Sequence, residues 1–165
     1  MDISGNPWNF NAADQATSYP IASIVRNGQG SALVTTSGTH ALVVGKNISL
    51  QGNIPGGWNG GYQVAEVPSN TTFLIAIPPQ QSTLANATGF GYVLTAAYMQ
   101  QVEVTQMIWD SPAASGVLLV TDLVGRILWN PTAPNSGGSL TYMKSFPISG
   151  LVLNQIGSGT LQVSV

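Results

Sequence analysis

SALVTTSGTHALVVGKNISLQGNIPGGWNGGYQVAEVPSNTTFLIAI, residues Ser31–Ile77, alternates apolar and polar residues between short groups of turn residues. This pattern is typical of antiparallel strands that fold back on one another. Ser37-Gly38 and Pro68-Ser69-Asn70 have the composition of tight turns. Within this stretch we expect strands at Ser31–Thr36, His40–Val44, Ile48–Gln51, Tyr62–Val67 and Thr71–Ile77.

The sequence of the whole 165-residue chain, like this stretch, predicts an all-β protein with almost no helix. We expect two small antiparallel units of β-sandwich or barrel-like form, at residues 21–98 and 99–165. Residues 1–20 lack strand or helix periodicity and are expected to form an extended arm. Whether the two units are separate domains or halves of one sandwich stays open.

The clearest hairpin of the C-terminal unit joins Gly116–Thr121 to Arg126–Trp129. Its connector, Asp122-Leu123-Val124-Gly125, offers Asp at the first corner and Gly where a left-handed residue is needed. Asp122 is therefore interpreted as a turn residue.

Charge is scarce, since only 6% of the residues are Asp, Glu, Lys or Arg, against about 25% in ordinary soluble domains. When protein covers a surface with few charges, few charged groups have to be desolvated. We therefore expect obligate assembly into a homo-oligomer. The four basic residues are scattered, which argues against a nucleic-acid partner. No apolar run approaches the about 20 residues of a membrane span, so we expect no membrane partner.

The side chains that perform chemistry are few. His40 is the one histidine, and there is no cysteine. A lone histidine beside a turn favours a structural role. Glu66 and Glu103 lie in predicted strands and could meet across a sheet, but nothing in the sequence predicts a cleft around them. We therefore expect no enzyme activity, no catalytic residue, no metal and no cofactor.

Two pairs of residues are candidates for contact with a partner. Trp8 and Phe10 stand in the polar N-terminal arm, where they either anchor it on a neighbouring subunit or pack on their own domain. Trp58 and Asn59 lie in a glycine-rich loop, which suits either a platform for a sugar ring or a hydrophobic plug at one end of the β unit.

Residues of the first unit resemble a small β module that recurs in virion proteins of tailed bacteriophages. The module spans about residues 31–95. The resemblance is carried by Gly38-Thr39-His40, Val44-Gly45, Ile48-Ser49-Leu50-Gln51-Gly52, Trp58-Asn59-Gly60-Gly61-Tyr62-Gln63-Val64, Val67-Pro68-Ser69 and Thr71-Thr72-Phe73.

The second unit is similar to small structural proteins of the same viruses. The matching features are Ile108-Trp109, the short turn around Pro112–Gly116, Val120-Thr121-Asp122, Gly125-Arg126, Ile127-Leu128-Trp129, Phe146-Pro147, Gly150-Leu151 and Ser158-Gly159-Thr160-Leu161-Gln162-Val163. These are turn and core residues, so the similarity concerns fold and context and identifies no site.

The resemblance implies a phage capsid decoration (cement) protein that binds the assembled head shell and stabilises it by bridging capsomers. Its implied partner is the major capsid protein, its favoured oligomer is a trimer, and its location is the outer surface of the virion after synthesis in the host cytoplasm. In that role Trp8 and Phe10 would contact the shell or a sister subunit. The alternatives are a tail, fibre or spike adhesin that binds host glycans, through Trp58 and Asn59 for example, or a glycan-binding module from outside a virus.

Overall fold

The computed structural model describes residues 8–27, 30–78, 85–88, 91–95 and 98–165. The described residues form thirteen strands and two single-turn 3₁₀ segments, η1 (Ala12–Asp14) and η2 (Gly56–Trp58). The predicted all-β class with almost no helix is therefore confirmed. The chain divides into two compact units, unit 1 (Met1–Ala16, Ala97–Asp122 and Arg126–Val165) and unit 2 (Thr17–Ala96 and Leu123–Gly125).

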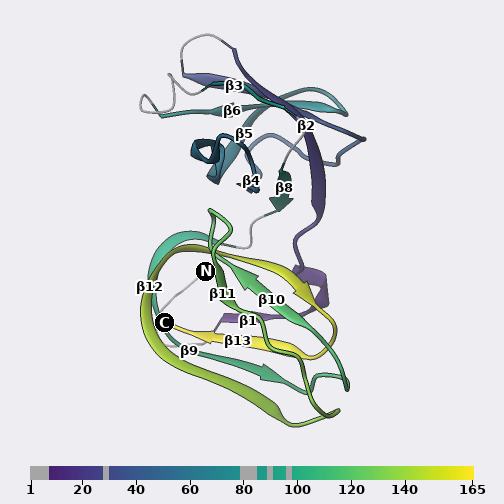
Figure 1. Cartoon of the computed structure of the whole chain (residues 1–165), viewed down its shortest axis with the longest axis vertical. Helices are drawn as coiled ribbons and strands as arrows, with labels where there is room; N and C mark the ends of the chain where they lie inside the picture. The colour runs from purple at the N-terminus through teal and green to yellow at the C-terminus, as the bar shows by residue number, and fades with distance from the viewer. Residues whose placement is uncertain (1–7, 28–29, 79–84, 89–90, 96–97) are drawn as a thin grey trace. The chain divides into compact units, whose positions relative to one another are not determined.

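Unit 2 is built on a closed antiparallel barrel of six strands. The ring runs β2-β3-β6-β5-β4-β8 and closes because β8 pairs with β2; the short β7 adds to β2 beside it. The strands, labelled in Figure 1 where there is room, are β2 (Ser18–Arg26), β3 (Ser31–Thr36), β4 (Asn47–Gln51), β5 (Gly60–Ser69), β6 (Thr72–Ala76), β7 (Ala87–Thr88) and β8 (Tyr92–Thr95).

Alternation along these strands builds the core of the barrel. In β3, Ala32 and Val34 point inward, and in β6 Phe73 and Ile75 do the same. A strand turns successive side chains to opposite faces, so a period of two in the sequence fills one interior. The predicted pairing across Pro68-Ser69-Asn70 is confirmed, since β5 and β6 are antiparallel neighbours.

The predicted strand at His40–Val44 does not form, and residues 37–46 are a loop between β3 and β4. The reason is that β3 already has a partner on each side, β2 and β6. His40 and Leu42 alternate with exposed residues as a strand would, because both side chains are buried against the barrel. Buried and exposed residues do alternate in this segment, but the alternation results from the packing of a loop and not from strand pairing.

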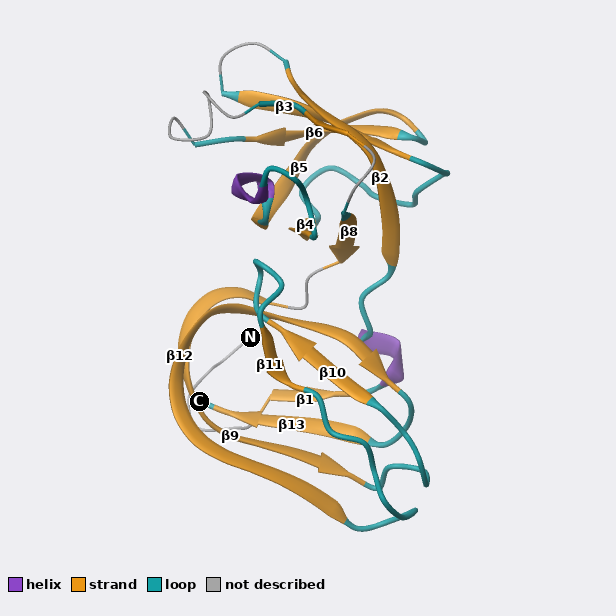
Figure 2. Cartoon of the chain, in the orientation of Figure 1, coloured by secondary structure: helices purple, strands orange, loops and turns teal. Residues whose placement is uncertain are grey.

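Unit 1 contains one six-stranded sheet in the order β1-β13-β9-β12-β10-β11. The 18-residue strand β12 curves strongly, and Figure 2 shows β9 following it. The first part of β12 pairs with β9, and the last part of β12 pairs with β10. The strands are β1 (Trp8–Phe10), β9 (Tyr98–Asp110), β10 (Leu118–Thr121), β11 (Ile127–Trp129), β12 (Ser139–Ile156) and β13 (Thr160–Ser164).

The predicted hairpin is present as β10 and β11. Gly125 has a φ of +94°, the left-handed conformation that its place in the turn requires. The Asp122 carboxylate is fully buried and accepts from the backbone N–H of Arg126 at 2.9 Å and from its Nε–H at 2.5 Å. This carboxylate therefore holds the turn together.

Residues 8–20 are not an extended arm. Trp8–Phe10 is strand β1, which pairs with β13 near the C-terminus, and Ser18 already belongs to β2. The boundaries of the compact units therefore differ from those expected after residues 20 and 98, because the N-terminal strand completes the sheet of the C-terminal unit. Residues 1–7 lie outside the described part of the chain.

Candidate functional site

Trp58 lies inside unit 2 and not on its surface. Its side chain is 0% exposed, and its indole Nε1–H donates to the carbonyl of Ala85 at 2.8 Å. The hydroxyl of Tyr62 donates to the carbonyl of Trp58 at 3.1 Å. A sugar ring needs an open aromatic face, so the geometry is that of the hydrophobic plug and not of the platform.

Asn59 is also occupied within its own loop. Its Oδ1 accepts the backbone N–H of Asn53 at 2.8 Å and the Nδ2–H of the same residue at 3.0 Å. Asn53 is buried, and its Oδ1 has no hydrogen-bond partner. This amide pair ties together the two ends of the loop that carries Trp58, which accounts for Asn59 without an external ligand.

Trp8 and Phe10 belong to the core of unit 1. Both rings are buried, Trp8 stacks on Tyr98 with 4.2 Å between ring centroids, and Phe10 meets the same ring edge-on. Packing on their own domain, which the sequence left open, is the observed arrangement. These rings are therefore not available to anchor a neighbouring subunit.

Tyr98 is the titratable centre of this aromatic cluster. Burial raises the pKa of the Tyr98 phenol above its usual value of 10.0, and the negative charge of Asp14 raises it further. Both causes favour the neutral phenol.

Glu66 and Glu103 do not lie on the same sheet. Glu66 lies on β5 of unit 2, whereas Glu103 lies on β9 of unit 1, where its carboxylate accepts from the hydroxyl of Ser145. Among the described residues, no group of three or more His, Asp or Glu side chains is placed to hold a metal ion. Nor does the described part of the chain hold a helix long and apolar enough to cross a membrane.

The outward surface of four strands in unit 1 has an unusual composition. The register places Asn9, Gln162, Ile108 and Thr141 in one row across β1, β13, β9 and β12. The next row contains Ser164, Gln106 and Met143. We call these seven side chains the outer face; the rows that alternate with them contain the buried Trp8, Trp109 and Leu161.

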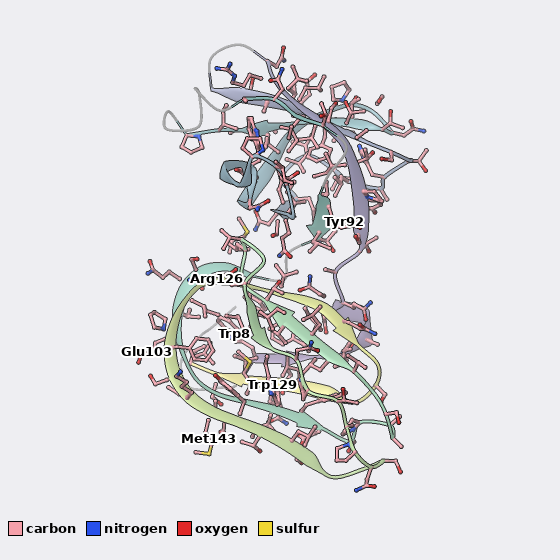
Figure 3. The ribbon with its side chains drawn as sticks, viewed as in Figure 1. Trp8, Tyr92, Glu103, Arg126, Trp129 and Met143 are labelled. Carbon is pink, nitrogen blue, oxygen red and sulfur yellow. The ribbon has the colours of Figure 1, made fainter. Side chains whose placement is uncertain are left out.

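No member of the outer face is charged. Met143 is 77% exposed, and Figure 3 shows it on the outer side of the curved β12 ribbon. The next row of the same face, Thr160, Asp110 and Ser139, carries one charge, and the Asp110 carboxylate accepts there from the hydroxyl of Ser139. Lys144 follows Met143 in an irregular stretch of β12. The surface thus offers hydroxyl and amide groups around two apolar side chains.

The sequence did not single out this surface. Alternation in Gln106–Asp110 and Thr160–Ser164 was visible, but alternation alone does not say which strands are neighbours. The four strands come from three distant segments, at residues 8–10, 98–110 and 139–164. Only their pairing brings the outward side chains into one surface.

A shallow hollow of about 200 Å³ lies near the loops of unit 1. It is lined by uncharged residues, with Pro112, Pro134 and Leu140 beside Asn135 and Ser139. Ligand pockets usually have about 300–1,000 Å³, and this one has no titratable group with which to perform chemistry. It does not compete with the outer face as a candidate site.

Comparisons with known protein families, with curated proteins and with solved structures found no significant match for this chain. The resemblance to phage virion proteins therefore stays a prediction from the sequence.

Proposed function

We propose that this chain is a non-enzymatic structural protein of a tailed-bacteriophage particle, a capsid decoration protein that binds the assembled head shell and stabilises it. The observation that carries the proposal is the outer face of unit 1. Covering an uncharged sheet surface with protein costs little desolvation, whereas covering the usual charged surface costs much more. The scarcity of charge in the whole chain supports the same conclusion.

The size of the outer face supports binding through several copies. Neighbouring side chains of one face are about 4.8 Å apart across the strands and about 6.8 Å apart along a strand, so seven of them cover roughly 230 Å². A stable interface takes about 800 Å² from each partner, so one outer face binds weakly. An oligomer that presents several faces gains affinity through effective concentration, and this is the physical reason for favouring a homotrimer.

The proposed partner is the major capsid protein, and the proposed location is the outer surface of the virion, reached after synthesis in the host cytoplasm. Neither a cofactor nor a nucleic-acid contact is required. The adhesin alternative was illustrated with Trp58 and Asn59, and with the Trp58 ring buried no specific observation favours it.

Binding to empty heads tests the proposal. Heads of the encoding phage that lack this protein are mixed with the purified chain, and co-sedimentation and resistance of the heads to heat are measured. Gln106→Lys and Met143→Lys each place a charge in the outer face, and we expect binding to weaken at least tenfold because that charge must be desolvated. Ala65→Lys, at an exposed position on β5 of unit 2, is the matched control.

The fold of each variant is checked by its urea unfolding midpoint, so that loss of binding is separated from loss of structure. If the wild type binds heads and neither lysine variant binds more weakly, another surface is used. No binding of the wild-type chain to heads, together with attachment to host cells or polysaccharide, would overturn the decoration role in favour of the adhesin.

A further inference from the structure

The first part of β12 forms a free edge of the sheet in unit 1. On one side, residues 139–143 pair with residues 106–110 of β9. On the other side no described strand pairs with them, because β10 reaches only residues 152–156. Figure 2 shows this part of β12 along the lower margin of unit 1. The closed barrel of unit 2, by contrast, pairs each of its six strands with two neighbours.

This edge is interrupted beyond Met143. The register with β9 shifts between Met143 and Phe146, Lys144 is exposed there, and Pro147 has no N–H to donate. Irregular register, lysine and proline are common means by which proteins protect a sheet edge against a further strand. Residues 139–143, with the sequence SLTYM, contain no charge, no proline and no shift of register. They are therefore the part of the edge that is open to another strand.

The same five residues of a second copy complement this edge. In the antiparallel pairing centred on Thr141, Thr141 faces its own counterpart, Leu140 faces Tyr142, and Ser139 faces Met143. Residues directly opposite one another in an antiparallel pair lie on the same face of the sheet, and pairs of threonines or of apolar side chains stabilise it. Leu140 and Tyr142 are only half-buried against the core of unit 1, and the second copy would cover more of both.

Met143 and the hollow of unit 1 meet in this pairing. Met143 is 77% exposed, the highest value among the large apolar side chains of the described residues. It lies opposite Ser139 of the second copy, and Ser139 lines the hollow of about 200 Å³ together with Leu140. A methionine side chain is flexible and fills irregular gaps, so each copy can place Met143 at the hollow of the other. The two-fold symmetry makes this contact twice.

We propose that residues 139–143 of two copies pair edge to edge around a two-fold axis at Thr141. The pairing makes the outer faces of the two copies, which include Thr141 and Met143, one continuous surface. A two-fold contact alone gives a dimer, and together with a three-fold contact elsewhere it gives a hexamer, so it is compatible with a homotrimer. Two short edges are small beside the about 800 Å² per partner of a stable interface, so the association depends on protein concentration. This inference does not depend on the virion role.

Charge complementation tests the pairing with the purified full chain, in the absence of heads. Thr141→Lys places two positive charges opposite each other at the two-fold axis and Thr141→Glu places two negative ones, so each variant alone should lose the contact. An equimolar mixture of the two variants places opposite charges there and should regain it. At a concentration of about 500 µM, we expect the mixture and the wild type to have twice the mass of either variant alone in analytical ultracentrifugation.

Thr141→Cys gives an independent test of the geometry, because the chain has no cysteine of its own. Directly opposite residues of an antiparallel pair have Cα atoms about 4.5–5.5 Å apart, within the about 4.4–6.8 Å that a disulfide spans. We expect oxidation with diamide to convert most of Thr141→Cys into a covalent dimer. Ala65→Cys, at an exposed position on a strand that is paired on both sides, is the control and should stay unlinked.

Equal mass of the wild type and both charged variants at the highest concentration overturns the pairing. So does cross-linking of Ala65→Cys as efficient as that of Thr141→Cys. The urea midpoint of each variant checks its fold, and the cysteine variants decide if a charged variant does not fold. Because heads take no part in these measurements, a failure of the pairing is distinct from a failure of the decoration role.

Discussion

Trp58 illustrates how one side chain contributes to unit 2. The indole has no exposed surface, lies among the apolar residues of the barrel and donates its N–H to Ala85. A large aromatic side chain in this position stabilises by burial, and its polar group is satisfied at the same time. Its role is therefore structural, and of the two interpretations that the sequence left open, the plug and the sugar platform, the structure shows the plug.

We predict that Trp58→Ala destabilises the chain by about 3–5 kcal/mol, because it opens a cavity in the barrel core. Trp58→Phe keeps most of the volume and should cost less, about 1–3 kcal/mol for the lost hydrogen bond. Urea unfolding followed by circular dichroism measures both. Unchanged stability of Trp58→Ala, with a loss of glycan binding, would instead support the adhesin alternative.

Tyr98 makes stability depend on pH in the alkaline range. Its pKa is raised in the folded state, first by burial and second by Asp14, above the value of 10.0 that it has when unfolded. The folded state thus favours the neutral phenol. Stability is unaffected below the unfolded pKa and is lost as pH rises from that value through the folded one.

We predict that the urea midpoint of the wild type falls between pH 9 and pH 11, and that Tyr98→Phe reduces this fall because the variant cannot ionise there. Asp14→Asn removes the smaller of the two causes and should reduce the fall only in part. A wild-type midpoint that falls no more than that of Tyr98→Phe would contradict the prediction.

Strand β1 shows how a short element can complete a distant sheet. It has three residues, yet Trp8 and Phe10 fill the same core as Leu161 and Val163 of β13. Removal of residues 1–15 would therefore take away a strand and two core aromatic side chains.

Phe10→Ala is therefore expected to destabilise unit 1 by about 3–5 kcal/mol. Gln162→Ala, on the opposite face of the neighbouring strand β13, is the control and should change stability by no more than about 0.5 kcal/mol. Near-ultraviolet circular dichroism during urea unfolding reports the packing of the aromatic cluster. Equal stability of the two variants would mean that β1 does not contribute to the core.

The described residues form two separate hydrophobic cores. One contains Trp58, Phe73 and the other barrel residues of unit 2, and the other contains Trp8, Phe10 and Trp109 of unit 1. No described residue belongs to both clusters. Each unit therefore has its own source of stability, which is how the chain forms two compact bodies with so little charge.

Separate cores predict additive energetics. The double variant Phe10→Ala, Trp58→Ala should lose the sum of the two single losses within about 0.5 kcal/mol, because the sites share no packing partners. The free energies of unfolding of the two single variants and the double variant, fitted with the same unfolding model, give the difference between the double loss and the sum of the single losses. An interaction energy above about 1 kcal/mol would show that the cores depend on each other.

Local patterns in the sequence determined the all-β class, the β5–β6 and β10–β11 hairpins and the turn roles of Asp122 and Gly125, because alternation and turn chemistry act between residues that are close in the chain. They also showed how few chemical groups the protein has. Which strands become neighbours was decided by tertiary structure. Only the pairing of β1 with β13 placed Trp8 and Phe10 inside unit 1, and only closure of the barrel buried Trp58 and His40. The outer face arose in the same way, since its side chains come from distant segments whose pairing depends on long-range packing.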